Sequence, residues 1–202
     1  MKHNNKMFLL FVITILTLFF LYTNSNKHRL YYKSSNDEPL NVYNQPLEQC
    51  PDSASESQGS WMQDKTCTEP GGGVHQICFK NIGTNANKFS KRTGQSDWST
   101  GRGDQNHCVC LGAWSLYEAK KNKGIFNDTN TSKLKCSAIP KTVFSEEYVN
   151  NFGTWNGHEL PNQIEDGLDG ILRECIQDAN GDQTKINNLK SNYNDFKSKI
   201  GL

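Results

Sequence analysis

The stretch that decides the fold is residues 67–114, CTEPGGGVHQICFKNIGTNANKFSKRTGQSDWSTGRGDQNHCVCLGAW. It holds four cysteines and two histidines within 44 positions, separated by glycine-rich segments. Residues 74–79 and 108–111 are short apolar runs that predict buried strands. A helix is expected after Gly112, because lysines fill its last turn and Gly124 follows. This stretch therefore predicts a small sheet joined to a helix, with cysteines on the loops.

Apolar spacing predicts helices in the last third of the chain. Six apolar residues between positions 164 and 176 fall on one face of a helix. Five more between positions 186 and 200 repeat at alternating intervals of three and four, which predicts a second helix packed on the domain or on a partner helix. Residues 40–44 and 134–138 resemble short strands, and a further helix is expected over residues 140–151.

These elements predict an α+β fold with a small mixed sheet, flanking helices and long loops cross-linked by cysteines. The cysteine-rich domain is assigned to residues 40–180 and a C-terminal amphipathic helix to residues 181–202. Apolar residues make up 35% of the chain and its mean hydropathy is −0.72, so the hydrophobic core is small. Small cores commonly need cross-links or a metal, which favours a structural role for the seven cysteines.

An unbroken apolar run, MFLLFVITILTLFFLY, occupies residues 7–22. Sixteen helical residues reach roughly 24 Å, short of the ~30 Å hydrocarbon core of a bilayer, and snorkelling lysines can close the gap. The run is longer than the usual apolar core of a signal peptide, and no A-x-A cleavage pattern follows it. We therefore expect a retained transmembrane signal anchor over residues 1–23 and a linker over residues 24–39. A cleaved signal peptide is the alternative.

Charge and composition narrow the choice of partners and compartment. Without Lys2 and Lys6, residues 24–202 carry 20 basic and 21 acidic side chains, a net charge of −1 with no basic stripe. This gives no electrostatic support for nucleic-acid binding. Asn127 and Asn130 each begin a glycosylation acceptor pattern, and a high cysteine content favours an oxidising compartment. We expect a single-pass membrane protein with a lumenal or extracellular C-terminal domain, although the flanking charges do not set its orientation.

The cysteines have three competing interpretations, of which disulfide formation is the first. The disulfide candidates are Cys50, Cys67, Cys78, Cys108, Cys110 and Cys136. Cys108 and Cys110 lie two apart on a predicted strand and share a face, so each can reach a different partner but they cannot easily bond to each other. Cys175, on the apolar face of a predicted helix, is the expected buried free thiol.

Zinc binding and thiol chemistry are the other two interpretations. The zinc candidates are Cys67, His75, Cys78, Cys108 and Cys110. Thiolates and imidazole suit a tetrahedral site, but these residues lack the close C-x2–4-C spacing of most structural zinc sites. A reactive Cys108 or Cys110 activated by a histidine is the enzymatic interpretation. The sequence shows no nucleophile, base and orienting residue in a recognisable set, so whether the protein is an enzyme stays open.

A set of short motifs resembles a known family. The residues concerned are Gly73, His75, Ile77, Cys78, Phe89, Ser90, Ser99, Thr100, Gly103, Asp104, Cys108, Val109, Cys110, Trp114, Glu118 and Ala119. Asn41-Val42, Pro46-Leu47 and Cys50 are similar to the opening strand and turn of the same family. Residues 40–120, and less closely those up to about 150, resemble the uncharacterised domain of unknown function twenty-two thirty-seven.

The resemblance implies a compact α+β domain without an established activity. Two departures are informative: the family often has adjacent cysteines where this chain has Thr66-Cys67, and a tryptophan where His107 stands. A site that required two adjacent cysteines at this position would lack one of them in this chain. We therefore expect a membrane-anchored, disulfide-stabilised domain with an interaction or structural role and no cofactor, contacting the membrane through residues 7–22 and a protein partner elsewhere. A zinc-binding or thiol-redox protein is the alternative.

Overall fold

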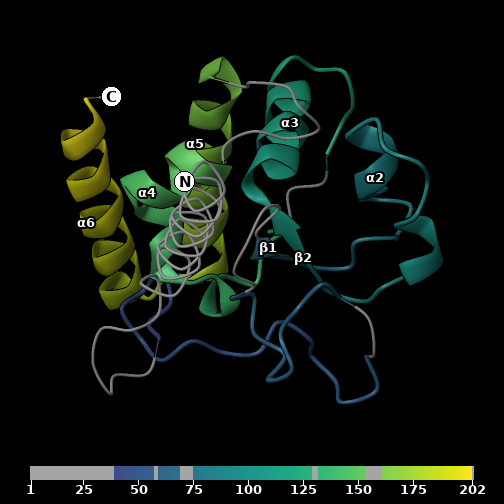
Figure 1. Cartoon of the computed structure of the whole chain (residues 1–202), viewed down its shortest axis with the longest axis horizontal. Coiled ribbons are helices and arrows are strands. Elements are labelled where there is room, and N and C mark those ends of the chain that lie inside the picture. Colours follow the sequence, from purple (N-terminus) through teal and green to yellow (C-terminus); the bar gives the residue numbers. More distant parts are fainter. Residues whose placement is uncertain (1–38, 57–58, 69–74, 129–131, 153–160, 202) are drawn as a thin grey trace, which may run out of the picture. The chain divides into compact units, whose positions relative to one another are not determined.

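The computed structural model describes residues 39–56, 59–68, 75–128, 132–152 and 161–201, and Glu38–Leu202 form one compact unit. In chain order its elements are β1 (His75–Phe79), α2 (Phe89–Arg92), η1 (Thr100–Arg102), β2 (His107–Cys110), α3 (Leu111–Asn122), η2 (Cys136–Ala138), η3 (Lys141–Phe144), α4 (Glu146–Phe152), α5 (Pro161–Asp178) and α6 (Gln183–Ile200), where η marks a 3-10 helix (Figure 1). The predicted α+β class is confirmed.

The sheet consists of β1 and β2, paired antiparallel with Cys78 opposite Cys108. An irregularity after His75 leaves that residue opposite Cys110. Leu134 adds an isolated antiparallel bridge to β1. The predicted mixed sheet is therefore wrong: the strands that the structure describes are antiparallel, and such a pair needs no helical crossover between its members.

Helix α3 continues directly from β2, so Leu111 begins the helix rather than ending the strand as predicted. Trp114 and Tyr117 on α3 are buried and stack with their ring centroids 5.8 Å apart. Phe79 of β1 meets the Tyr117 ring edge-on at 5.4 Å. This aromatic cluster holds the sheet against α3, which places the cysteines of both strands at the centre of the domain.

Figure 1 shows α5 between α3 and α6, and the contacts between these helices agree. Two glycines allow α3 and α5 to approach closely. A Cβ atom on Gly167 would lie 2.8 Å from Ser115 Cβ, and one on Gly170 would lie 2.7 Å from Glu118 Cγ. Trp114 Nε1 donates a hydrogen bond to Gly167 O at 2.7 Å, which ties the two helices together at the same point.

Both predicted C-terminal helices are confirmed, as α5 and α6. The side chain of Asp182 accepts hydrogen bonds from the backbone N–H groups of Thr184 and Lys185, which caps the N-terminus of α6. The apolar face of α6 packs on α5, α4 and η3, within the same compact unit. Asn192 also donates to Val42 O at 3.0 Å, so α6 is bonded to the first described segment of the domain.

Three local predictions are wrong, and hydrogen bonding explains two of them. Leu40 and Asn41 make isolated bridges, and the chain then turns instead of continuing as a strand, because Asn41 Oδ1 accepts from the N–H groups of Tyr43 and Gln45 at 2.9 and 3.2 Å. Residues 134–138 make one bridge and then a 3-10 turn, where Asp178 accepts from the Cys136 N–H at 3.2 Å. The predicted 140–151 helix is divided into η3 and α4.

The predicted anchor over residues 1–23 and all but the last residue of the predicted linker lie outside the described residues. None of the helices that the structure does describe is both long enough and apolar enough to cross a membrane.

Candidate functional site

The two-stranded sheet carries a pair of neighbouring disulfides. Cys78 and Cys108 face each other across the strands, so their side chains leave the same face of the sheet. Each bonds to a cysteine from the preceding loops, forming Cys50–Cys78 and Cys67–Cys108 with Cα atoms 5.6 and 5.5 Å apart. All four residues are fully buried. The register of the sheet therefore sets the two cross-links side by side.

Hydrogen bonds hold the same loops in place alongside the disulfides. Asn106 Nδ2 donates to Cys50 O at 2.8 Å, and the Cys50 N–H donates to Lys65 O at 2.9 Å. The Cys108 N–H donates to Gly59 O at 2.7 Å. As a result the Sγ atoms of Cys50, Cys67 and Cys108 all lie within 4.8 Å of one another. Four sulfur atoms are thus gathered in one buried cluster, which we call the sulfur cluster (Cys50, Cys67, Cys78 and Cys108).

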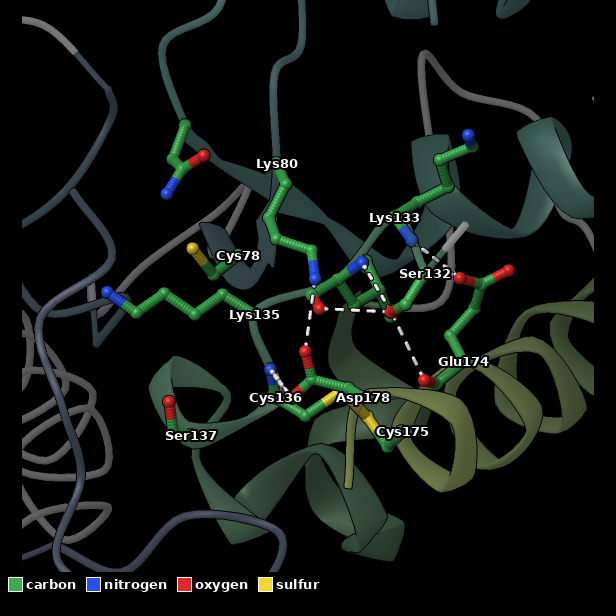
Figure 2. Close-up of polar contacts among 12 residues, drawn as sticks. Cys78, Lys80, Ser132, Lys133, Lys135, Cys136, Ser137, Glu174, Cys175 and Asp178 are labelled. Carbon is green, nitrogen blue, oxygen red and sulfur yellow. Dashed lines mark hydrogen bonds and ion pairs between the residues drawn. A yellow bond between two sulfur atoms is a disulfide. The ribbon is translucent and has the colours of Figure 1, made fainter. Parts of the chain in front are cut away.

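A third disulfide, Cys136–Cys175, joins the first residue of η2 to α5 with Cα atoms 5.5 Å apart. Polar groups surround it (Figure 2). Asp178 Oδ1 pairs with Lys80 Nζ at 3.0 Å, while Asp178 Oδ2 accepts from the Cys136 N–H at 3.2 Å. One turn earlier on α5, Glu174 Oε2 accepts from the Lys133 N–H at 2.6 Å. The carboxylates of α5 thus fix the backbone that carries Cys136.

Tyr43, which is 132 positions before Cys175 in the sequence, also belongs to this group. Its buried hydroxyl donates to Cys175 O at 2.7 Å and lies 3.3 Å from Asp178 Oδ2. Burial, reinforced by the nearby Asp178 carboxylate, raises the pKa of Tyr43 well above its ordinary value. The folded protein therefore holds this hydroxyl protonated as a hydrogen-bond donor.

Replacement of Tyr43 by phenylalanine is expected to lower the free energy of unfolding by about 1–2 kcal/mol near neutral pH, because Cys175 O loses one of its two donors and keeps only the Ala179 N–H. Above pH ~10 the unfolded wild-type chain loses the Tyr43 proton while the folded chain keeps it, so wild-type stability falls as pH rises. The variant lacks that loss, and the difference between the two proteins should shrink. Urea unfolding of both proteins near neutral pH and above pH ~10 measures this difference in stability. A difference that does not change with pH would contradict the raised pKa of Tyr43.

The free cysteine is Cys110, and not Cys175 as predicted, because Cys175 pairs with Cys136. Cys110 is a buried residue at the junction of β2 and α3. Burial raises the pKa of its thiol and outweighs the opposing effect of the backbone N–H groups of Ala113 and Gly112. A raised pKa leaves little thiolate at neutral pH, so the thiol is a poor nucleophile.

Cys110 lines a small cavity together with His75 and His107, the two histidines of the 67–114 stretch, and with Trp98 and Gln95. The volume of this cavity is about 60 Å³. Sites for small-molecule ligands usually measure ~300–1,000 Å³, so this one admits water-sized molecules rather than an organic substrate. The thiol and the imidazoles are therefore brought together, but without room for a substrate.

The predicted zinc set is divided by the structure. Cys67, Cys78 and Cys108 lie in the sulfur cluster and are oxidised, whereas His75 and Cys110 line the small cavity. Of the six disulfide candidates, all except Cys110 are in disulfides. The sequence did not predict a role for Cys50 in a ligand group, although Cys50 Sγ belongs to the cluster.

Sequence reasoning also missed a cluster of charged residues between α3 and α5. Glu118 is fully buried, accepts from Lys121 Nζ at 2.7 Å and pairs with Arg173. Burial raises the pKa of Glu118, against the effect of these two cations. An open hollow of about 440 Å³ lies beside the cluster, lined by Lys121, Phe126, Arg173, Glu174 and others. The i,i+3 pair of Glu118 and Lys121 was the only visible indication in the sequence.

One of the two predicted glycosylation sites can be placed. Asn127 is exposed and lines the rim of this hollow. Its neighbour Asp128 turns inward, where it pairs with Lys133 at 3.1 Å. Asn130 lies outside the described residues.

No family model, curated protein or solved structure matches this chain. The resemblance of residues 40–120 to the uncharacterised family stays a prediction.

Proposed function

We propose that this protein is a membrane-anchored domain on the lumenal or extracellular side of a bilayer, where it binds a protein partner. The observation that carries the proposal is the set of three buried disulfides in one small domain. Disulfides persist in oxidising compartments and are rare in the cytosol. The domain is therefore disulfide-stabilised and extracytoplasmic, and residues 7–22 are the segment suited to hold it at the membrane.

A binding role is favoured over catalysis by the state of the thiols. Six of the seven cysteines are oxidised and buried, and the thiol of Cys110 has a raised pKa beside a cavity of about 60 Å³. A thiol-redox enzyme needs an accessible thiol of low pKa. The hollow of about 440 Å³ near Asn127 offers charges of both signs, and neighbouring Ile125 is 64% exposed. This surface suits a polar protein partner with an apolar contact.

Membrane attachment and topology can be tested with the full chain expressed in cells that glycosylate secreted proteins. We expect the protein to resist extraction by alkaline carbonate and to lose mass on glycosidase treatment. The variants N127Q and N130Q should each remove one glycan without changing extraction. Release into the supernatant would contradict the anchor, and an unglycosylated domain digested by protease outside sealed microsomes would contradict the orientation.

The redox state can be tested independently by counting thiols. Alkylation of the denatured, unreduced protein should label one cysteine per chain, Cys110, whereas labelling after reduction should reach all seven. In the native protein, labelling of Cys110 should be slow because its thiol is buried and its pKa is raised. Labelling of six or seven cysteines without reduction would overturn the proposed extracytoplasmic role.

A further inference from the structure

We propose that the sulfur cluster is also a zinc site: in the reduced chain Cys50, Cys67, Cys78 and Cys108 bind one Zn²⁺ as four thiolates. This inference goes beyond the membrane-anchored binding role and does not depend on it. It differs from the zinc set expected from the sequence, because Cys50 replaces His75 and Cys110. Every chain is synthesised with its cysteines reduced, so this state precedes the disulfides.

The positions of the sulfur atoms carry the proposal. A tetrahedral zinc site with Zn–S bonds of ~2.3 Å sets its sulfurs ~3.8 Å apart. The Sγ atoms of Cys50, Cys67 and Cys108 already lie within 4.8 Å of one another. Cys78 Sγ is bonded to Cys50 Sγ, so it is next to the same group, and the members of both bonded pairs, Cys50–Cys78 and Cys67–Cys108, move apart once the bonds are broken. Rotation about the Cα–Cβ bonds supplies movements of this size.

The scaffold that gathers the cysteines does not depend on the disulfides alone. Cys78 and Cys108 are held opposite each other by the register of β1 and β2. Cys50 is held by Asn106 and Lys65 through its own backbone groups. The Met62 N–H donates to Thr66 O at 3.0 Å, which closes the turn that leads into Cys67. Reduction therefore leaves the four thiols facing a common point rather than releasing them.

The chemistry and surroundings of the cluster suit Zn²⁺. Four thiolates are a common ligand set of structural zinc, and full burial excludes water from the ion. The Lys135 N–H donates to Cys78 O at 3.0 Å, while Lys135 Nζ lies 3.3 Å from Pro51 O beside Cys50. These two contacts of Lys135 hold the backbone next to Cys78 and next to Cys50, while its charge is paired with Asp52 Oδ1 at 2.9 Å.

The conversion of the disulfide form of the sulfur cluster into the zinc-bound form is balanced in atoms and electrons. Each disulfide takes up two electrons and two protons from a dithiol reductant, which is itself oxidised to a disulfide. The two disulfides of the cluster therefore yield four thiols. Binding of Zn²⁺ forms four Zn–S bonds and releases four protons to solvent. Two equivalents of a disulfide oxidant reverse the sequence: they take up four electrons and four protons and become thiols, while the two disulfides of the cluster re-form and Zn²⁺ is released.

The test uses the full chain in detergent, reduced with a phosphine and loaded with Zn²⁺ or with Co²⁺ as a spectroscopic probe. We expect one metal ion per chain and a Co²⁺ spectrum with the visible bands of a tetrahedral tetrathiolate site. Peptide mapping after alkylation should show zinc-dependent protection of the four cluster cysteines. The labelling rates of Cys136 and Cys175 should be the same with and without zinc.

Two variants separate the site from general thiol binding. C78S removes one ligand and should weaken zinc binding by more than ~100-fold, since changes outside the ligand shell already cost ~10–100-fold. C175S lies outside the cluster and should still bind one ion with an unchanged Co²⁺ spectrum. Substoichiometric metal, equal protection of all seven cysteines, or a C78S protein that binds like wild type would overturn the proposal. So would a reduced chain that unfolds and is not refolded by zinc.

Discussion

The double variant C136A/C175A is expected to be less stable than wild type by about 4 kcal/mol in its free energy of unfolding. The two cysteines are separated by 39 positions. For a loop of this length, the loss of unfolded-chain entropy caused by a cross-link corresponds to about 4 kcal/mol at 25 °C. Stabilities of whole domains are only ~5–15 kcal/mol, so this change removes a large share of the total.

The size of this effect depends on what remains around the broken cross-link. Asp178 keeps its contact with the Cys136 N–H, and Tyr43 keeps its hydrogen bond to Cys175 O. The local fold should therefore persist, with α5 still packed on α3. We expect the loss to be seen as a lower midpoint of urea unfolding with little change in the circular dichroism of the folded state.

The variant C110A is the matched control, because it removes a buried sulfur without breaking a cross-link. It should cost about 1 kcal/mol, as expected for a small loss of buried volume. Equal midpoints for C110A and C136A/C175A would show that the third disulfide contributes only packing. That result would also remove the main argument that the small core depends on cross-links.

Substitution of Gly167 by alanine is expected to lower the free energy of unfolding by about 3 kcal/mol, at the upper end for overpacked cores. The added methyl group would lie 2.9 Å from the Ser115 Cα on α3, and backbone on both sides resists displacement. The hydrogen bond from Trp114 to Gly167 O would be strained by the same shift. For a chain of this size, 3 kcal/mol corresponds to a fall in Tm of roughly 6–12 °C.

Helix propensity alone predicts the opposite sign for this substitution. Alanine is favoured over glycine within a helix by about 1 kcal/mol, so G167A would stabilise an isolated α5. The control is G101A, because a Cβ atom on Gly101 meets nothing within 4 Å. We expect thermal unfolding of G101A to stay within about 0.5 kcal/mol of wild type. A G167A protein as stable as wild type would mean that α3 and α5 pack less closely than described.

The α+β class and the C-terminal helices could be predicted because they follow from local periodicity. The six apolar residues between positions 164 and 176 are spaced so that they share one face of an α-helix, and the structure has α5 over these positions. β1 was predicted to within one residue for the same reason. Strand predictions failed where a side chain bonded the backbone into a turn, which at residues 40–44 is the nearby Asn41 and elsewhere comes from a distant segment. At residues 134–138, for example, the Asp178 carboxylate on α5 bonds the Cys136 N–H and favours a turn over a strand.

The sequence predicted most of the residues of the candidate site but not how they are arranged in space. Cys67, Cys78 and Cys108 were singled out as cross-links or ligands, and all three lie in the sulfur cluster. The fourth member, Cys50, was not expected to be a ligand, because its loop reaches the sheet through a hydrogen bond from Asn106, 56 positions away in the chain. The charged group around Glu118 was missed for a similar reason: Arg173 and Glu174 lie on another helix.

By itself, the sequence determined that this small domain would combine short strands with amphipathic helices, and it favoured cross-links over zinc binding and thiol chemistry as the role of its cysteines. Those properties depend on residue type and on the spacing of apolar residues over one or two turns, and a short segment of sequence is enough to show both. Only the tertiary structure decided that Cys175 bonds to Cys136 while Cys110 stays reduced. A disulfide requires two Cα atoms within a few ångströms, and that distance is set by how α5 packs across the domain.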